Sequence, residues 1–371
     1  MNPITLLPEQ QAAATAIIDW FATSPNLEFR LGGYAGTGKT TVIRHLVEAF
    51  ERDDQRVAVS AFTGKAVNVL QRKGLYNACT LHSLMYDVEV LPNGQFEFHL
   101  KNPSSLKFDL IIVDEASMLS TELYNHLRTF KEKLLFVGDP GQLEPVGDNP
   151  NLMRETHLTL KTIHRQAENS PIITFANDIR LGKNLGPFEL EGCSARKKAG
   201  FQIPSIADFD QVICAKNATR LDINRKYRAW KQLQENVPQV GEKIIVLRNN
   251  TSYSVFNGML LTIDEILETR PLCYLVNLSD DLGNSFKKVP IWSEPFSKDI
   301  GKEFTIPKLG PKEPQMIYAD FGYAITCHKS QGSEWDKVLV WDEFMPPKIW
   351  DMKRWRYTAI TRASKELVYC F

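Results

Sequence analysis

The chain has 371 residues, 43% of them hydrophobic and 24% charged, which is the composition of a globular protein large enough for two or more domains. Its 44 Lys and Arg balance its 44 Asp and Glu, so the net charge does not indicate a polyanionic partner. Such a partner would have to bind in a groove with local positive charge. Six scattered cysteines without a C-x-x-C pair argue against a zinc site or a disulfide framework and favour a reducing cytoplasm, and the sequence has neither a signal peptide nor a membrane-spanning stretch.

Short apolar runs recur along the first part of the chain and predict a parallel sheet that is covered on both faces. The runs lie at residues 29–31, 57–59, 110–113 and 134–137. Polar or glycine-rich segments follow each run, and ligands of such sheets bind beyond the carboxyl ends of the strands. We therefore expect an α/β domain over residues 1–157 with its site at that edge.

Residues 33–40 match the phosphate-binding pattern G-x-x-x-x-G-K-[ST]. The context fits, because an apolar run precedes the pattern and an amphipathic helix is expected over residues 40–50. Glycines let backbone N–H groups point at phosphate oxygens, Lys39 reaches the β and γ phosphates, and the Thr40 hydroxyl binds Mg²⁺. The residues expected to bind nucleotide here are Gly33, Ala35, Gly36, Thr37, Gly38, Lys39, Thr40 and Thr41.

An acidic pair, Asp114 and Glu115, directly follows the run at 110–113. After a phosphate-binding loop, such a pair can hold the Mg²⁺ shell through Asp114 and polarise the attacking water through Glu115. The alternative is a solvated strand end.

Residues 88–100 place Asn93-Gly94 between two β-favouring runs and predict a hairpin inserted at about 86–106. With these two residues as the turn, Leu91 faces Phe96, Glu89 faces Phe98, and both phenylalanines lie on one face. The rings could contact DNA bases, or they could pack the hairpin on its own domain.

The second half of the chain predicts another α/β domain, over residues 158–240 and 319–371, with strands at 211–214, 338–340 and 367–369. Between its two parts, residues 241–318 contain short β-like runs broken by Asn-Gly, Pro and Gly. A small β-barrel inserted into the second domain fits this pattern.

The ordered segments resemble the motif set of superfamily 1 helicases. They are, in chain order, Gln10, residues 33–40, 61–66, 80–83, 114–118, 138–146, 164–166, 325–334 and 357–363. Only about thirty residues separate Ser83 from Asp114, too few for the large helical insertion of some members. The short hairpin and the small barrel resemble the Dda-like and RecD-like subgroup (subgroup B).

The resemblance implies an α/β fold of two tandem RecA-like P-loop motor domains, with the β-hairpin inserted in the first and an SH3-like β-barrel in the second. It implies that Arg362 is an arginine finger, that Arg165 is a second γ-phosphate arginine, and that Gln142 couples the γ-phosphate to the DNA groove. The alternatives are surface salt bridges for the arginines and an ordinary loop position for Gln142. Gln10, Gly332 and Glu334 complete the expected ATP site, with Gln10 at the adenine and Glu334 at the ribose.

The resemblance also implies a set of strand-contacting residues rich in hydroxyls and cations, which suit phosphates without reading sequence. The set is Thr63, Lys65, Thr80, His82, Thr326, His328 and Lys329, with Phe96 and Phe98 of the hairpin. For His82 alone, a core or surface position is the alternative.

The implied function is that of a monomeric, stand-alone DNA helicase that uses ATP and Mg²⁺, moves 5′→3′ on single-stranded DNA and unwinds forked or tailed duplexes. Single-strand-binding, replisome or recombination proteins are candidate partners. The expected location is the cytoplasm, of a bacterium or of a phage's host. The rival hypotheses are a superfamily 1 RNA helicase and a nucleotide-dependent clamp or loader that does not unwind.

Overall fold

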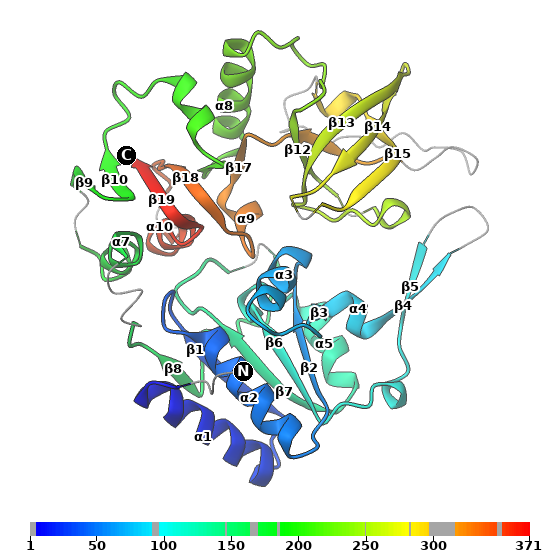
Figure 1. The fold of residues 1–371 in the computed structure, drawn as a ribbon, viewed down its shortest axis with the longest axis vertical. Coiled ribbons are helices and arrows are strands. Elements are labelled where there is room, and N and C mark those ends of the chain that lie inside the picture. Colours follow the sequence, from blue (N-terminus) through cyan, green and yellow to red (C-terminus); the bar gives the residue numbers. More distant parts are fainter. Residues whose placement is uncertain are drawn as a thin grey trace.

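The computed structural model describes residues 5–90, 96–144, 147–163, 170–183, 186–248, 250–281, 283–296, 316–346 and 351–371. Figure 1 shows two α/β units, one above the other, with a third, antiparallel sheet beside the upper one. We call them the first α/β unit, the second α/β unit and the third sheet. No helix in the described ranges is long and apolar enough to cross a membrane.

The first α/β unit contains a parallel sheet in the order β3-β2-β6-β7-β1-β8. Its strands are β1 (Glu28–Gly33), β2 (Val57–Ala61), β3 (Cys79–Thr80), β6 (Leu110–Asp114), β7 (Lys133–Gly138) and β8 (Leu158–Leu160). All four predicted runs are strands of this sheet. The predicted boundary after residue 157 is too early, because β8 pairs with β1 and so completes the first sheet.

Helices cover both faces of this sheet. On one face α1 (Pro8–Thr23), α2 (Lys39–Arg52) and α3 (Gly64–Arg72) bury a cluster that includes Leu31, Ile43 and Leu135. On the other face α4 (Leu81–Met85) and α5 (Thr121–Thr129) pack over Ile111 and Phe136. Burial on both faces explains why the strands are continuous apolar runs rather than alternating ones.

The hairpin consists of β4 (Tyr86–Val90) and β5 (Phe96–Leu100), and its register differs from the prediction. Val90 faces Phe96 and Val88 faces Phe98, so five residues (91–95) connect the strands instead of the two-residue Asn93-Gly94 turn. A two-residue turn would place Pro92 in the closing pair, where a backbone N–H is needed that proline lacks. The turn itself lies outside the described residues.

The second α/β unit has a sheet in the order β17-β11-β18-β19-β10-β9, parallel except for β9. The strands are β9 (Phe188–Leu190), β10 (Cys193–Arg196), β11 (Gln211–Cys214), β17 (Ala324–Thr326), β18 (Trp335–Trp341) and β19 (Ala363–Cys370). α7 (Pro171–Arg180) and α10 (Met352–Ile360) pack on one face, and α8 (Asn217–Trp230) packs on the other. The short α9 (Cys327–Ser330) follows β17.

The third sheet is antiparallel, in the order β15-β14-β13-β12-β16. Its strands are β12 (Lys243–Val246), β13 (Leu260–Thr269), β14 (Cys273–Ser279), β15 (Ser285–Trp292) and β16 (Ala319–Phe321). The predicted boundary at 318/319 is wrong, because β16 pairs with β12 and so belongs to this sheet. Single-turn and short 3-10 helices are η1 (Pro103–Ser105), η2 (Ala116–Met118), η3 (Ile203–Asp208), η4 (Thr251–Tyr253) and η5 (Glu294–Phe296).

Candidate nucleotide site and strand-contacting surface

The phosphate-binding loop connects the end of β1 to the start of α2. Gly36 (φ 78°) and Gly38 (φ 81°) adopt left-handed backbone conformations, which L side chains rarely do. At Gly38 a Cβ atom would also lie 2.3 Å from Nε2 of Gln10, so a side chain there would displace the Gln10 carboxamide. The backbone thus favours glycine at both positions, although only Gly38 is a fixed glycine of the pattern, and the loop leads into the N-terminus of α2, where anions are favoured.

Lys39 is bonded to the loop itself. Its ammonium group donates to the carbonyl oxygens of Gly33 (2.8 Å) and Tyr34 (3.3 Å). The Tyr34 carbonyl also accepts the Thr37 hydroxyl at 2.8 Å. A nucleotide phosphate would therefore compete with neutral carbonyl oxygens for the cation, and its charge favours it.

Asp114 and Glu115 lie at the end of β6, as predicted. Burial and the neighbouring Glu115 raise the pKa of Asp114 to about 6, while Lys39 acts to lower it. Glu115 adopts a left-handed backbone (φ 53°), and its Oε2 has no hydrogen-bond partner among the described residues. Mg²⁺ takes oxygen ligands and is usually held by one or two protein oxygens and by substrate phosphates. The Thr40 hydroxyl and the buried Asp114 carboxylate fit that donor set, because a cation would compensate the cost of burying the carboxylate.

Gln10 connects α1 to the phosphate-binding loop. Its Nε2 donates to the Thr37 carbonyl at 2.9 Å, and its Oε1 accepts from Leu7 N at 2.9 Å. The carboxamide keeps one N–H and one lone pair, which could bind a further partner such as adenine. The contact with adenine itself stays a prediction.

The second α/β unit contacts this loop through α10. The Tyr357 hydroxyl accepts from Ala35 N at 2.7 Å and donates to Oδ2 of Asp139 at 2.7 Å. From α7, the Arg180 guanidinium lies 3.8 Å from the centre of the Tyr34 ring. Burial raises the pKa of Asp139, against the effects of Lys39 and the Tyr357 hydrogen bond.

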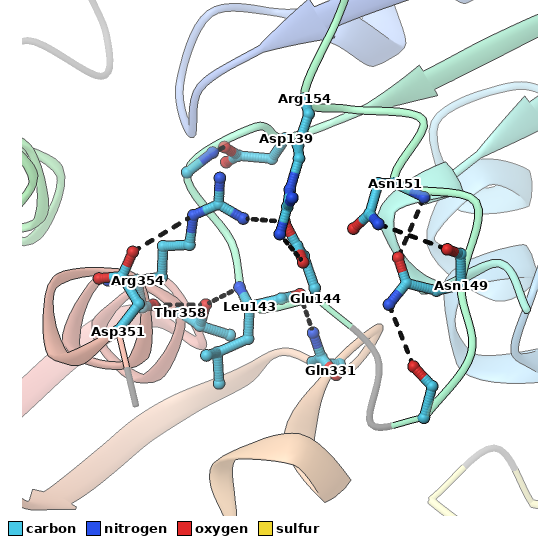
Figure 2. A network of polar contacts seen from close by, with 12 residues as sticks. Asp139, Leu143, Glu144, Asn149, Asn151, Arg154, Gln331, Asp351, Arg354 and Thr358 are labelled. Carbon is cyan, nitrogen blue, oxygen red and sulfur yellow. Dashed lines mark hydrogen bonds and ion pairs between the residues drawn. The ribbon is translucent and has the colours of Figure 1, made fainter. Parts of the chain in front are cut away.

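Further interdomain bonds join α10, and the residue directly after α9, to the loop after β7 (Figure 2). Leu143 N donates to the Thr358 hydroxyl at 2.8 Å, and the Leu143 carbonyl accepts from Gln331 Nε2 at 2.6 Å. Glu144 accepts from Arg354 of the second unit and from Arg154 of the first. The 139–144 loop therefore contacts both units.

Three further predicted catalytic residues differ in their surroundings. Arg362 is buried and donates to the carbonyls of Thr358 and Ser333, each at 3.1 Å, so its guanidinium is held within its own unit. Gln142 is buried in the 139–144 loop, and its Oε1 has no partner among the described residues. Arg165 lies outside the described residues. None of their roles is tested by these contacts.

Three predicted strand-contacting threonines stand at helix N-termini. Thr63 caps α3 by accepting from Ala66 N at 3.1 Å, and Thr80 caps α4 by accepting from Ser83 N at 3.2 Å. Thr326 occupies the same position before α9 without a side-chain cap. Helix N-termini attract anions, so these positions suit phosphate contacts for a reason beyond their hydroxyls.

The two predicted strand-contacting lysines already have partners in other parts of the protein. Lys65 lies 4.1 Å from the centre of the Trp335 ring and 3.9 Å from Asp281 of the third sheet, and burial lowers its pKa. Lys329 donates to Asn257 Oδ1, and burial lowers its pKa to about 8. Both cations therefore lie where the units meet the third sheet.

Gly332, Glu334 and His328 do not converge on the phosphate-binding loop in the described contacts. Gly332 (φ 69°) packs against Thr63 of the first unit, and Glu334 is exposed on the side of Lys65. Burial lowers the pKa of His328. The expected ribose contact stays a prediction.

The hairpin base is an aromatic cluster. The His82 ring stacks on Tyr86 (centroids 5.7 Å apart), and the Phe98 ring meets both edge-on. The Tyr86 hydroxyl is bonded to His126. These contacts favour the packing interpretation for Phe98 and His82, whereas the side chain of Phe96 lies outside the described residues.

Sequence reasoning missed Tyr357, Asp139 and Arg180. Tyr357 and Asp139 lie within the segments 357–363 and 138–146, which resemble family motifs. That resemblance is the one feature of the sequence that could have indicated a role for them. Which loop each side chain meets depends on how the two units pack, and no local pattern encodes that. Arg180 lies in no recognised segment.

The fold and the site define an α/β protein with a phosphate-binding loop. A family model described as an AAA domain matches residues 5–197, more than half of the chain, and the chain belongs to that family. A second model, described as a UvrD-like helicase C-terminal domain, matches residues 321–370. The predicted membership in superfamily 1 helicases of the Dda and RecD type is confirmed.

Two curated relatives are DNA helicases by name, and they match different shares of this chain. The ATP-dependent RecD2 DNA helicase of Deinococcus radiodurans is 26% identical over 361 residues, covering 90% of this chain and 45% of that protein. The ATP-dependent DNA helicase dda of Enterobacteria phage T4 is 28% identical over 165 residues, covering 41% and 38%. The chain thus spans less than half of the length of these relatives.

A solved structure of Bacteroides Pif1 bound to single-stranded DNA has the same fold, with a TM-score of 0.54. It is 19% identical, and the match covers 99% of this chain and 92% of that one. The predicted α/β fold is confirmed in this respect.

Proposed function

We propose that the protein is an ATP-dependent DNA helicase that translocates on single-stranded DNA and unwinds duplexes. One observation carries the proposal: the second α/β unit bonds directly to the phosphate-binding loop through Tyr357, so an event at the nucleotide can move one unit against the other. The names of the relatives, RecD2 and dda among them, support the same activity. The two units would be RecA-like motor domains, and the third sheet an SH3-like insert.

The chemistry follows from the residues at the phosphate-binding loop. Lys39 would leave the carbonyls of Gly33 and Tyr34 and bind the β and γ phosphates, while Glu115 orients the attacking water. Mg²⁺, when bound, would be held by Thr40 and Asp114 and would neutralise phosphate charge. Arg165 and Arg362 would approach the γ-phosphate from the second unit, and Gln142 would couple it to the strand.

Movement of the strand would follow from closing and opening of the two units. Thr63, Thr80 and Thr326, at helix N-termini, would hold phosphates without reading bases. The hairpin would separate the strands at a fork. We expect 5′→3′ movement by a monomer, on the resemblance to the Dda and RecD subgroup.

Strand displacement on 5′-tailed and 3′-tailed duplexes tests the proposal. We expect ATP-dependent unwinding of the 5′-tailed substrate only, single-strand-stimulated ATP turnover, and binding that weakens with salt as counterions are released. Lys39→Ala should reduce turnover on the order of 10²-fold or more, because a cation on the transferring phosphate is lost. Turnover without unwinding on either substrate would favour a clamp or loader, and stimulation by RNA alone would favour an RNA helicase.

A further inference from the structure

Among the described residues, helix α10 makes most of the direct bonds between the two units near the nucleotide site. Thr358 bonds to Leu143 N and Arg354 bonds to Glu144, so adjacent turns of the helix hold the 139–144 loop. Tyr357, between them, instead reaches both this loop and the phosphate-binding loop. Among the described residues of α10, Tyr357 is the one that hydrogen-bonds to the phosphate-binding loop.

The Tyr357 hydroxyl is fixed in direction by two short bonds. It accepts from Ala35 N and donates to Asp139, each at 2.7 Å, so its single proton is committed to the carboxylate. The residue is 2% exposed, and Asp139 is 1% exposed, so water does not compete for either bond. A buried bond to a charged group is among the stronger hydrogen bonds in proteins.

Packing holds the ring in place as well. A Cβ atom added at Gly141 would lie 3.0 Å from Cε1 of Tyr357 and 3.3 Å from Cδ1 of Tyr34, so glycine is what lets these rings approach the loop. Arg180 covers the Tyr34 ring from the second unit. The ring of Tyr357 therefore has one arrangement in which its hydroxyl reaches both partners.

The bond to Ala35 is significant because of the peptide group to which that N–H belongs. The carbonyl of the same group, that of Tyr34, accepts from Lys39 at 3.3 Å and from the Thr37 hydroxyl. A peptide group is planar, so its carbonyl and its N–H reorient together. When a phosphate draws Lys39 away, the change at the Tyr34 carbonyl reaches Tyr357 through one rigid unit.

We propose that Tyr357 is a positioning residue that transmits occupancy of the phosphate-binding loop to α10 and to the 139–144 loop. The inference rests on the proposed function for its role in coupling, but the contact itself does not. Tyr357 touches neither nucleotide nor strand in this role. It acts through the Tyr34–Ala35 peptide and through Asp139.

Tyr357→Phe tests the proposal, because it removes the hydroxyl and keeps the ring. We expect single-strand-stimulated kcat to fall on the order of tenfold, while KM for ATP changes by no more than about threefold. Hydrogen–deuterium exchange gives a second measurement that needs no activity. In the parent protein a non-hydrolysable ATP analogue should change exchange in both the 33–40 loop and α10, and in the variant only the loop should respond.

Tyr323→Phe is the matched control, since the Tyr323 hydroxyl also donates to a carboxylate, that of Glu242, at 3.0 Å. This bond lies where the second unit meets the third sheet and does not involve the phosphate-binding loop. It should leave kcat and both exchange responses at parental values.

A double variant tests whether Tyr357 and Asp139 act together. Combining Tyr357→Phe with Asp139→Asn should lower kcat no further than the worse single variant, because both substitutions remove the same hydrogen bond between the two side chains. Additive losses, or an α10 response that persists in Tyr357→Phe, would overturn the inference. A parent protein with both exchange responses but no strand-stimulated turnover would instead overturn the proposed function alone.

Discussion

Several side chains that the sequence assigned to phosphates already have protein partners. Lys39 is bonded to loop carbonyls, Lys65 to Asp281 and Trp335, and Arg362 to carbonyls of its own unit. Each cation is thereby satisfied in the described structure. To bind a phosphate, Lys39 and Arg362 must give up neutral carbonyl oxygens, and Lys65 must give up the Asp281 carboxylate. Ligand affinity at these residues therefore includes the free energy of breaking internal contacts.

Arg362 is expected to stabilise the transferring phosphoryl group. Arg362→Ala should lower ATP turnover on the order of 10³-fold, the lower end for arginine fingers. Arg362→Lys is the control, because lysine keeps the charge but cannot make the forked contacts to Thr358 and Ser333. Steady-state turnover and thermal melting should be measured together. A turnover loss below tenfold in the alanine variant would leave Arg362 a structural residue.

Lys329 should make strand binding depend on pH. Burial, with a smaller effect of Arg220, lowers its pKa to about 8, and only the protonated form attracts a phosphate. Affinity for single-stranded DNA should therefore fall as pH rises from 7 to 9, by at most about tenfold at pH 9. His328 does not contribute in this range, because burial lowers its pKa below the ordinary histidine value.

Fluorescence anisotropy with a labelled oligo-dT at fixed ionic strength measures this dependence. Lys329→Arg stays protonated across the range and should flatten the profile. Profiles of the two proteins that coincide would show that Lys329 does not contact the strand.

At the scale of elements, the hairpin and α10 contact their surroundings in different ways. The hairpin is attached at its base, where Phe98, Tyr86 and His82 form one aromatic cluster, and Figure 1 shows its strands projecting from the first unit. α10 is fixed along its length by bonds to the 139–144 loop. The hairpin can therefore be shortened without disturbing the nucleotide site. Shortening α10 would break its bonds to the 139–144 loop.

Shortening the hairpin should separate unwinding from ATP turnover. Replacing residues 89–97 with Asn-Gly keeps the Val88 and Phe98 pair and the aromatic base. Opening a base-pair step costs about 1–2 kcal/mol, and stacking a base on an aromatic ring returns about 1–3 kcal/mol, so a ring near the tip could offset most of that cost. We expect strand-stimulated turnover to stay near parental values and unwinding to collapse.

Phe96→Ala should show a graded form of the same separation. Phe98→Ala is the comparison, because it removes a ring of the hairpin base and should lower the melting temperature as well. Parental unwinding by the shortened protein would remove the hairpin from the mechanism. Parallel loss of turnover would assign the hairpin to the fold.

At the scale of the whole molecule, the third sheet is attached to the second unit through buried charge. Arg228 of α8 makes a bidentate contact with Glu242, just before β12, and Arg220 pairs with Asp320 of β16 at 2.7 Å. The Arg228 guanidinium also lies 3.6 Å from the centre of the Phe321 ring. Such pairs fix geometry more than they add stability, so they make α8 a rigid support for the sheet.

Removing one partner of this junction should be strongly destabilising. Arg228→Met leaves Glu242 buried without its counter-charge and should lower the free energy of unfolding by about 3–5 kcal/mol. Arg225→Met is the matched control on the same helix, because Arg225 pairs with Asp222 at the surface and should cost less than about 1 kcal/mol. Urea denaturation followed by tryptophan fluorescence measures both. Equal effects of the two substitutions would contradict a structural role for the buried pair.

The sequence by itself determined the parts whose physics is local. The four apolar runs became strands of the first sheet, and Gly38, a fixed glycine of the phosphate-binding pattern, adopts a left-handed conformation. A strand covered on both faces, or a turn that needs positive φ, is encoded by the residues that form it. Family membership followed from the order of such segments.

Only the tertiary structure decided what depends on residues far apart in the chain. The pairings of β8 with β1 and of β16 with β12 moved both predicted boundaries, because a strand belongs to the sheet that satisfies its backbone hydrogen bonds. The hairpin register pairs Val90 with Phe96 and Val88 with Phe98, which differs from the register predicted from Asn93-Gly94. The contact of Tyr357 with Ala35 spans 322 residues, and it exists because two α/β units pack together, which no local pattern specifies.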